Sequence, residues 1–218
     1  MYHNIFFDLD GTLTDSKEGI LNCVRYALER LGEPIPEERE LLKFIGPPLQ
    51  DSFRDFCGFS PERTREAVRL FRERYAPIGK FENRPTPGAA EICARLKAEG
   101  RALAIASCKP ERMCQEICRR FEFTPSMETI TGSPPEADWT KEHIIQETMR
   151  RLGLGEPDRS RTLMIGDRKF DVVGAKACGI DCVGVEFFGY AEPGELEAAG
   201  AVAVVKNLEE LEAFLAAH

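Results

Sequence analysis

The stretch that decides the fold is HNIFFDLDGTLT, residues 3–14. Its apolar, β-prone run at residues 5–7 leads directly into two carboxylates, Asp8 and Asp10, and then into Gly11. Side chains of an extended segment alternate between its two faces, so the two carboxylates point the same way and repel each other unless a cation or a shared proton compensates. Gly11 permits a sharp turn and the close approach of a ligand. The stretch therefore predicts a buried strand that ends in a ligand-binding turn.

Two other interpretations of this stretch are less satisfactory. An isolated Asp-x-Asp is usually a polar loop, but here it follows an apolar strand and precedes a glycine turn. An EF-hand calcium loop does not fit, because no helix precedes the carboxylates and the next ligand positions hold Thr12 and Thr14.

The rest of the chain divides into a helical part and an alternating part. Helical patterns occupy residues 17–30, 37–44, 49–57 and 61–75, with no strand pattern between residues 16 and 82. After the stiff segment RPTPG at residues 84–88, strands expected at 101–106, 127–131, 162–166, 181–185 and 201–205 alternate with helices at 88–99, 110–121, 141–152, 171–178 and 207–216. Such alternation is typical of a parallel sheet with helices on both faces.

These patterns predict an α/β protein with two domains. Residues 1–15 and 83–218 are expected to form a doubly wound, Rossmann-like parallel sheet, and residues 16–82 an inserted all-helical cap domain. Because the insertion directly follows the two carboxylates, it is placed to act as a lid. Ligands of doubly wound sheets bind beyond the carboxyl ends of the strands, which is where the first stretch delivers Asp8 and Asp10.

Composition limits the environment and the partners. The 218 residues carry a formal net charge of −8, which argues against a nucleic-acid polymer as partner. No apolar run is long enough to cross a bilayer and the N-terminus lacks the pattern of a signal peptide, so we expect a cytoplasmic protein without a membrane partner. The eight cysteines include no C-x-x-C pair, and we expect them to be reduced and structural.

Polar residues at the ends of the later strands extend the candidate site. Ser107 follows the strand at 101–106, where it either caps the next helix or holds a phosphate together with free backbone amides. Cys108 adjoins it, but a cysteine nucleophile is disfavoured because the residue six positions later is Cys114, not the arginine of a Cys-x5-Arg loop. Lys141 opens a helix, where a cation is mildly unfavourable unless an anion lies nearby.

The most specific later signal is the segment LMIGDRKFD, residues 163–171. A buried strand and a glycine precede Asp167 and Asp171, which the i, i+4 spacing would place together on the first turn of the next helix. At the same sheet edge as Asp8 and Asp10, they make four acids that need a hard cation among them. Oxygen ligands and retained waters favour Mg²⁺.

Four motifs, DLDGT at residues 8–12, Ser107, Lys141 and GDRKFD at residues 166–171, follow one another in the order typical of the haloacid dehalogenase-like (HAD) superfamily. The whole chain resembles the phosphatase branch of that superfamily. Its Asp10 argues against the dehalogenase branch, since cleavage of a carbon–halogen bond needs no acid to protonate the leaving halide.

The resemblance implies a role for each matching residue. Asp8 would attack phosphorus and form an aspartyl-phosphate, while Asp10 protonates the leaving alcohol and then deprotonates the hydrolytic water. Lys141 would steady the nucleophile and the phosphate, with Lys109 as the second candidate for this role. Ser107, Lys141 and the Gly11 amide would hold the phosphate oxygens, with Cys108 adjoining them. Mg²⁺ would be held by Asp8, Asp167 and the backbone carbonyl of Asp10, and Asp171 would either bind it directly or orient the ligands.

The cap is expected to select the substrate, through Ile45, Gly46 and Pro47 of the loop at residues 44–48 and through Arg54, which could equally be an exposed helix charge. The arrangement resembles most the phosphoglycolate phosphatase group with a helical (C1-type) cap, and IGPPL at residues 45–49 is similar to members described as 5'-nucleotidases. Sugar-phosphate phosphatases, phosphomutases and non-catalytic binders of phosphorylated metabolites rank lower. We therefore expect a monomer or homodimer that acts on a small phosphorylated metabolite, phosphoglycolate first and nucleoside monophosphates as the alternative.

Overall fold

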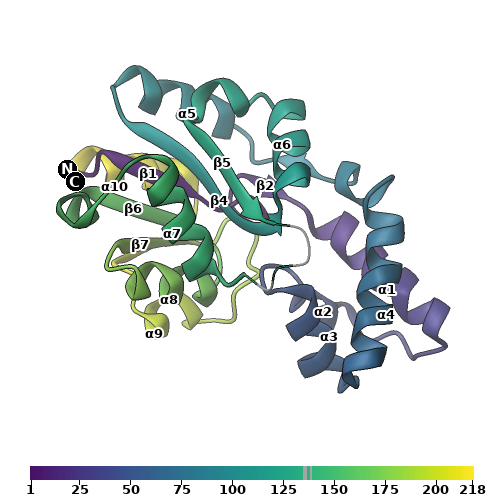
Figure 1. Ribbon diagram of the computed structural model, residues 1–218. Coiled ribbons are helices and arrows are strands. Elements are labelled where there is room, and N and C mark those ends of the chain that lie inside the picture. The colour runs from purple at the N-terminus through teal and green to yellow at the C-terminus, as the bar shows by residue number, and fades with distance from the viewer. Residues whose placement is uncertain (135–136, 138) are drawn as a thin grey trace. The chain divides into compact units, whose positions relative to one another are not determined.

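Strand β1 (Asn4–Phe7) lies at the centre of a six-stranded sheet in the computed structural model, which describes residues 1–134, 137 and 139–218. The strand order is β5-β4-β1-β6-β7-β8 and the pairings are parallel (Figure 1). The other strands are β4 (Ala102–Pro110), β5 (Thr129–Ser133), β6 (Thr162–Gly166), β7 (Asp181–Val185) and β8 (Ala203–Val205). The chain runs from β1 outward to β4 and β5 and then returns to β6 on the other side of β1. This reversal next to β1 is the place where parallel sheets bind ligands.

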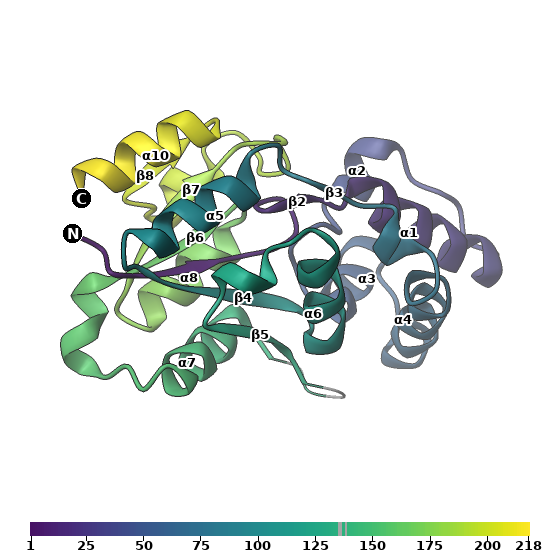
Figure 2. The ribbon, with the colours of Figure 1, turned by 90° about the horizontal axis from the view of Figure 1, so that it is seen from above.

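Helices cover both faces of the sheet because the strand side chains alternate (Figures 1 and 2). Ile5 and Phe7 belong to one buried cluster, with α5 (Ala89–Ala98), α6 (Glu111–Arg120) and α10 (Leu208–Ala217). Phe6 belongs to the opposite cluster, with α7 (Lys141–Arg151), α8 (Lys169–Ala177) and α9 (Glu195–Ala199). The predicted α/β fold with a parallel sheet between two helical layers is confirmed.

Residues 15–84 form a compact unit of their own, and residues 1–14 with 85–218 form the other. The smaller unit contains α1 (Lys17–Leu31), α2 (Glu38–Leu42), α3 (Leu49–Cys57), α4 (Pro61–Tyr75) and the 3-10 helix η1 (Gly79–Phe81). The two connecting segments, β2 (Thr14–Asp15) and β3 (Arg84–Pro85), pair with each other. Throughout the described parts of the chain, no helix has the length and apolar character to cross a lipid bilayer.

The bounds of several elements differ from the sequence-based prediction, and β2 and β3 were not predicted. Strand β4 continues to Pro110, because it pairs with β5 again at Pro110 after an irregularity that begins at Ala106. Helix α8 begins at Lys169 instead of residue 171. The short helix α9 was not predicted; it spans only Glu195–Ala199, too few residues for a recognisable helical period.

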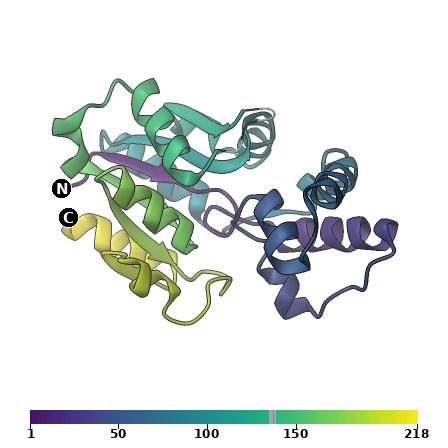
Figure 3. The ribbon, with the colours of Figure 1, turned by 60° about the horizontal axis from the view of Figure 1, so that its bottom comes forward.

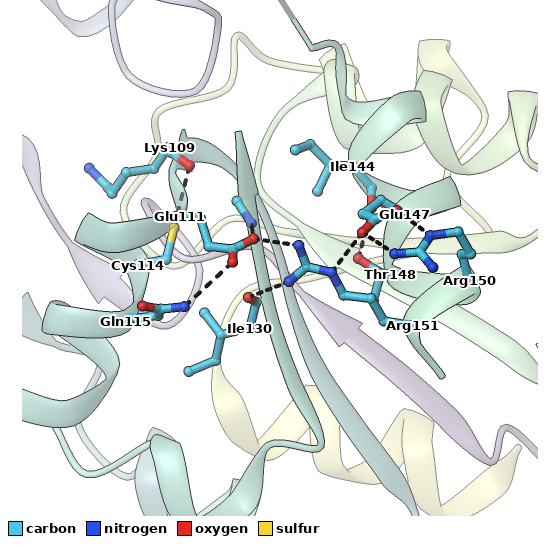
Figure 4. A network of polar contacts seen from close by, with 11 residues as sticks. Lys109, Glu111, Cys114, Gln115, Ile130, Ile144, Glu147, Thr148, Arg150 and Arg151 are labelled. Atoms are coloured by element: carbon cyan, nitrogen blue, oxygen red, sulfur yellow. Dashed lines mark hydrogen bonds and ion pairs between the residues drawn. The ribbon is translucent and has the colours of Figure 1, made fainter. Parts of the chain in front are cut away.

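A polar network ties the two helices that flank the edge strand β5 (Figure 4). Arg151 at the end of α7 pairs with Glu111 at the start of α6 and with Glu147, each at 2.8 Å, and also donates to the Ile130 carbonyl at 3.2 Å. Glu111 in turn accepts from the Gly132 amide at 3.2 Å. The network therefore occupies polar groups of an edge strand and fixes the start of α6 to it.

Both termini lie at the same end of the larger unit, where Figure 3 shows them next to each other. The rings of Tyr2 and Phe214 stack with centroids 6.2 Å apart. The Tyr2 hydroxyl donates to Asp181 at 2.7 Å. These contacts of Tyr2 fix the backbone that leads into β1.

Candidate active site

Three buried carboxylates meet at the carboxyl ends of β1 and β6. Asp8 follows β1 and Asp167 follows β6, while Asp171 lies in the first turn of α8. One oxygen from each lies within 4.8 Å of the others, and the three residues are 4%, 2% and 1% exposed. Asp167 precedes the helix instead of lying on its first turn as predicted, and Asp171 accepts from the Arg168 amide at 3.1 Å, which caps α8.

Asp167 is a buried carboxylate without a hydrogen-bond partner among the residues that the structure describes. Within the described residues, neither of its oxygens has a donor. Burial, followed by the charges of Asp171 and Asp8, holds the pKa of Asp167 well above its usual value. An all-oxygen ligand set with one carboxylate left unpartnered is what a hard divalent cation requires, so these residues fit Mg²⁺.

Gly11 leaves the space that Asp167 occupies. Its φ is +77°, a conformation that favours glycine, and a Cβ there would overlap the Asp167 carboxylate. The Gly11 amide donates to the Thr14 carbonyl at 2.8 Å within the turn. The predicted use of this amide for a phosphate oxygen would therefore require it to give up that bond.

Lys141 enters the carboxylate cluster from the start of α7. Its Nζ lies 3.0 Å from Asp8 Oδ2 and 2.7 Å from Asp171 Oδ1, and it donates to the Ala106 carbonyl at 2.9 Å. Burial by itself lowers the pKa of Lys141, but the carboxylates of Asp171 and Asp8 outweigh it and hold the pKa well above its usual value. The lysine is 4% exposed and stays charged, and it fixes one oxygen of Asp8. The other oxygen, Oδ1, accepts from the Leu9 amide at 2.7 Å.

Asp10 pairs with the second lysine. Its Oδ2 lies 2.8 Å from Lys109 Nζ, and its side chain is not in the group of three carboxylates. The predicted metal contact of Asp10 is through its backbone carbonyl and stays a prediction. The two lysines thus contact different aspartates, Lys141 with Asp8 and Lys109 with Asp10.

Ser107 and Cys108 lie in the irregular end of β4. Ser107 is 3% exposed and its Oγ accepts from the Lys109 amide at 3.4 Å; the residue that caps α6 is Pro110, so Ser107 does not cap that helix. Burial raises the pKa of Cys108 to about 12, which leaves its thiol protonated. This agrees with the prediction that Cys108 does not act as a nucleophile.

The model of the haloacid dehalogenase-like hydrolase family matches residues 5–185. This range includes the four aspartates and the two lysines of the site. The chain belongs to this family. The prediction of a HAD-type hydrolase from the four motifs is therefore confirmed.

Two relatives of this HAD chain carry the names of enzymes that hydrolyse phosphate esters. A 5'-nucleotidase of Pseudomonas aeruginosa is 39% identical over 218 residues, covering 100% of this chain and 97% of that protein. A phosphoglycolate phosphatase of Cupriavidus necator is 29% identical over 216 residues, 97% of this chain and 92% of that protein. The crystal structure of a predicted phosphatase from Clostridium acetobutylicum superposes with a TM-score of 0.94 at 34% identity, covering 100% of both chains. The protein is a HAD-type phosphatase.

The predicted cap residues of this HAD phosphatase lie in the smaller unit. Ile45 and Pro47 are buried, and Gly46 between them has a φ of +104°. Arg54 is on the exposed side of α3, where it pairs with Asp51 at 2.8 Å and with Asp55 at 2.7 Å. Their role in substrate selection stays a prediction, and Arg54 would have to leave two acidic neighbours to bind a second anionic group.

Sequence reasoning missed one buried ion pair beside the carboxylates. Arg168 Nε donates to Glu195 Oε1 at 2.9 Å, and the same oxygen accepts from the Lys169 amide at 2.9 Å. Although burial acts in the opposite direction, these donors hold the pKa of Glu195 below its usual value. The pair ties α9 to the start of α8, which carries Asp171. The partners are far apart in sequence and α9 is too short to predict, so no local pattern pointed to it.

Proposed function

We propose that this phosphatase hydrolyses a small phosphate monoester through an aspartyl-phosphate formed on Asp8. The observation that carries the proposal is the position of Asp8 itself. One of its oxygens is held by the Leu9 amide and the other by Lys141, at the carboxyl end of the central strand. A carboxylate is a weak nucleophile toward a phosphate dianion, and a fixed orientation beside a permanent cation offsets part of that weakness.

The chain's own residues supply both half-reactions. In the first, Asp8 attacks phosphorus, the bond to the leaving oxygen breaks, and Asp10 gives that oxygen a proton. In the second, Asp10 takes a proton from a water whose oxygen attacks phosphorus, and the bond to Asp8 breaks. Ser107 and Lys141 would hold the phosphate oxygens during both steps.

Mg²⁺ fits the same site. Asp8, Asp167 and the backbone carbonyl of Asp10 would hold it, and Asp171 would orient Lys141 or bind directly. When bound, the ion would neutralise the excess of carboxylate charge and the charge of the incoming phosphate. The observation that supports this assignment is that neither Asp167 oxygen has a hydrogen-bond donor within the described part of the chain.

Nucleoside 5'-monophosphates are the substrates that the relatives support best. The 5'-nucleotidase shares 39% of aligned residues with this chain and the phosphoglycolate phosphatase 29%, both over nearly the whole length. This order differs from the expectation drawn from the family resemblance, which placed phosphoglycolate first. Phosphoglycolate is the second candidate, supported by the second relative.

The test is phosphate release by the purified protein, with and without Mg²⁺, from 5'-mononucleotides, 2-phosphoglycolate, sugar phosphates and p-nitrophenyl phosphate. We expect Mg²⁺-dependent release that is highest with a 5'-mononucleotide and is abolished by Asp8→Asn. Preference for 2-phosphoglycolate would move the assignment to the second candidate. Release that Asp8→Asn leaves unchanged would contradict the aspartyl-phosphate mechanism.

A further inference from the structure

We propose that Lys109 is a positioning residue for the proton transfers of this phosphatase, because it holds one carboxylate oxygen of Asp10 and leaves the other for proton exchange. The inference rests on the proposed function. Lys109 Nζ lies 2.8 Å from Asp10 Oδ2, with the lysine side chain 6% and the aspartate side chain 12% exposed. Asp10 Oδ1 is buried and, among the described residues, has no hydrogen-bond partner.

The two oxygens of Asp10 therefore have different surroundings. A free carboxylate can rotate and present either oxygen, so only part of the population has the geometry needed for proton transfer. A charge-assisted contact to Oδ2 restricts that rotation, because turning the carboxylate would move Oδ2 away from the Lys109 ammonium and break the contact. We infer that Oδ1 gives the proton to the leaving oxygen and later takes one from the hydrolytic water.

Lys109 is itself held by the end of β4. Its amide donates to Ser107 Oγ at 3.4 Å, and its carbonyl accepts from the Cys114 thiol at 3.5 Å (Figure 4). Two residues further on, Glu111 is bound to the Gly132 amide and to Arg151. The backbone from which the ammonium reaches Asp10 is thus fixed on the edge strand and on α7, as a positioning role requires.

The two lysines contact different carboxylates, and this difference supports the assignment. Lys141 contacts Asp8, the proposed nucleophile, and Asp171. Lys109 contacts Asp10, the proposed acid and base. A lysine that only neutralised phosphate charge would affect all phosphate esters alike, whereas one that positions Asp10 matters most where the leaving oxygen needs a proton.

The test compares two leaving groups by kcat/KM, which covers the steps up to phosphoenzyme formation. Nitrophenolate leaves readily without a proton, and the alkoxide of a nucleoside 5'-monophosphate does not. General acid catalysis typically contributes about 10²- to 10⁴-fold. We expect Lys109→Met to lower kcat/KM for the nucleotide by about 10- to 100-fold and for p-nitrophenyl phosphate by less than about threefold. Lys109→Arg, which keeps the charge, should restore part of the nucleotide activity.

Two further variants separate positioning from a structural effect. Lys176→Met removes an exposed lysine and should change neither value. In an Asp10→Ala background, Lys109→Met should change kcat/KM for the nucleotide by less than about twofold, since the residue it positions is gone. This comparison also holds if the single variant is less stable.

Distinct results would overturn the inference. An equal loss for both substrates, or a loss that persists in the Asp10→Ala background, would show that Lys109 acts on phosphate binding or on the fold, and the proposed function would stand. Absence of phosphate release by the wild-type protein would instead overturn the proposed function itself.

Discussion

Replacing Gly11 by alanine should weaken Mg²⁺ binding far more than it weakens the fold, and Gly32→Ala provides the matched control. The two glycines have similar φ values, +77° and +70°. Alanine in this conformation costs about 1–2 kcal/mol at either position. An added Cβ would overlap the Asp167 carboxylate at Gly11, but at Gly32 it would meet no atom of the described residues within 4 Å.

The overlap at Gly11 is with the end of a side chain, so it is relieved by moving the Asp167 carboxylate. That movement displaces a proposed metal ligand, which we expect to lower Mg²⁺ affinity about 10- to 100-fold, the range observed when residues that orient metal ligands are removed. At a Mg²⁺ concentration of about 100 times the wild-type Kd, the ion stabilises the wild type by about 2.7 kcal/mol. A protein that binds 100-fold more weakly gains only about 0.4 kcal/mol at that concentration.

Thermal unfolding over a Mg²⁺ series measures both effects. In the absence of Mg²⁺, both variants should unfold about 2–8 °C below the wild type. Added Mg²⁺ should raise the Tm of the wild type and of Gly32→Ala by about 5–10 °C, but that of Gly11→Ala by only about 1–2 °C for a 100-fold loss of affinity and about 3–6 °C for a 10-fold loss. An equal response of all three proteins would refute the placement of Asp167 in the metal site. A weak response of Gly32→Ala would show that backbone strain, not the contact with Asp167, is responsible.

Three further predictions address groups around the site. Glu195→Gln should lower the free energy of unfolding by about 2–4 kcal/mol in chemical denaturation, because the neutral amide no longer balances the charge of the buried Arg168 guanidinium from α9; an unchanged midpoint would contradict this. Arg151→Met removes two ion pairs and a hydrogen bond to the edge strand, at a side chain that is 30% exposed. It should lower the free energy of unfolding by about 1 kcal/mol in low salt and by less in 1 M NaCl, and a loss that does not depend on salt would argue against the ion pairs. Cys108, with its pKa raised to about 12, should react with iodoacetamide at pH 7 at least about 100-fold more slowly than free cysteine and faster as the pH rises toward 11, as followed by peptide mass spectrometry. Rapid labelling at pH 7 would show that the pKa of this partly buried thiol is not raised.

The central strand and its two carboxylates could be predicted from the sequence because the signal is local. The apolar run before Asp8 and Asp10, the glycine turn and the segment at residues 163–171 each specify a strand and the residues at its end. Alternation of strands and helices then places those ends at one edge of a parallel sheet. The parallel sheet and three of the four acids expected at its edge follow from such local patterns, whereas the side chain of the fourth, Asp10, pairs with Lys109.

The contacts between residues far apart in the chain were decided only by the tertiary structure. The resemblance to the family offered both Lys109 and Lys141 for one role, and the fold gives them different aspartates because one extends from the end of β4 and the other from the start of α7. Likewise, the burial of Asp167 without a donor and the pairing of Arg168 with Glu195 arise from strand order and helix packing. A sequence records which groups occur at the end of an element. Which of them touch depends on the order in which strands pair, and many segments of the chain determine that order together.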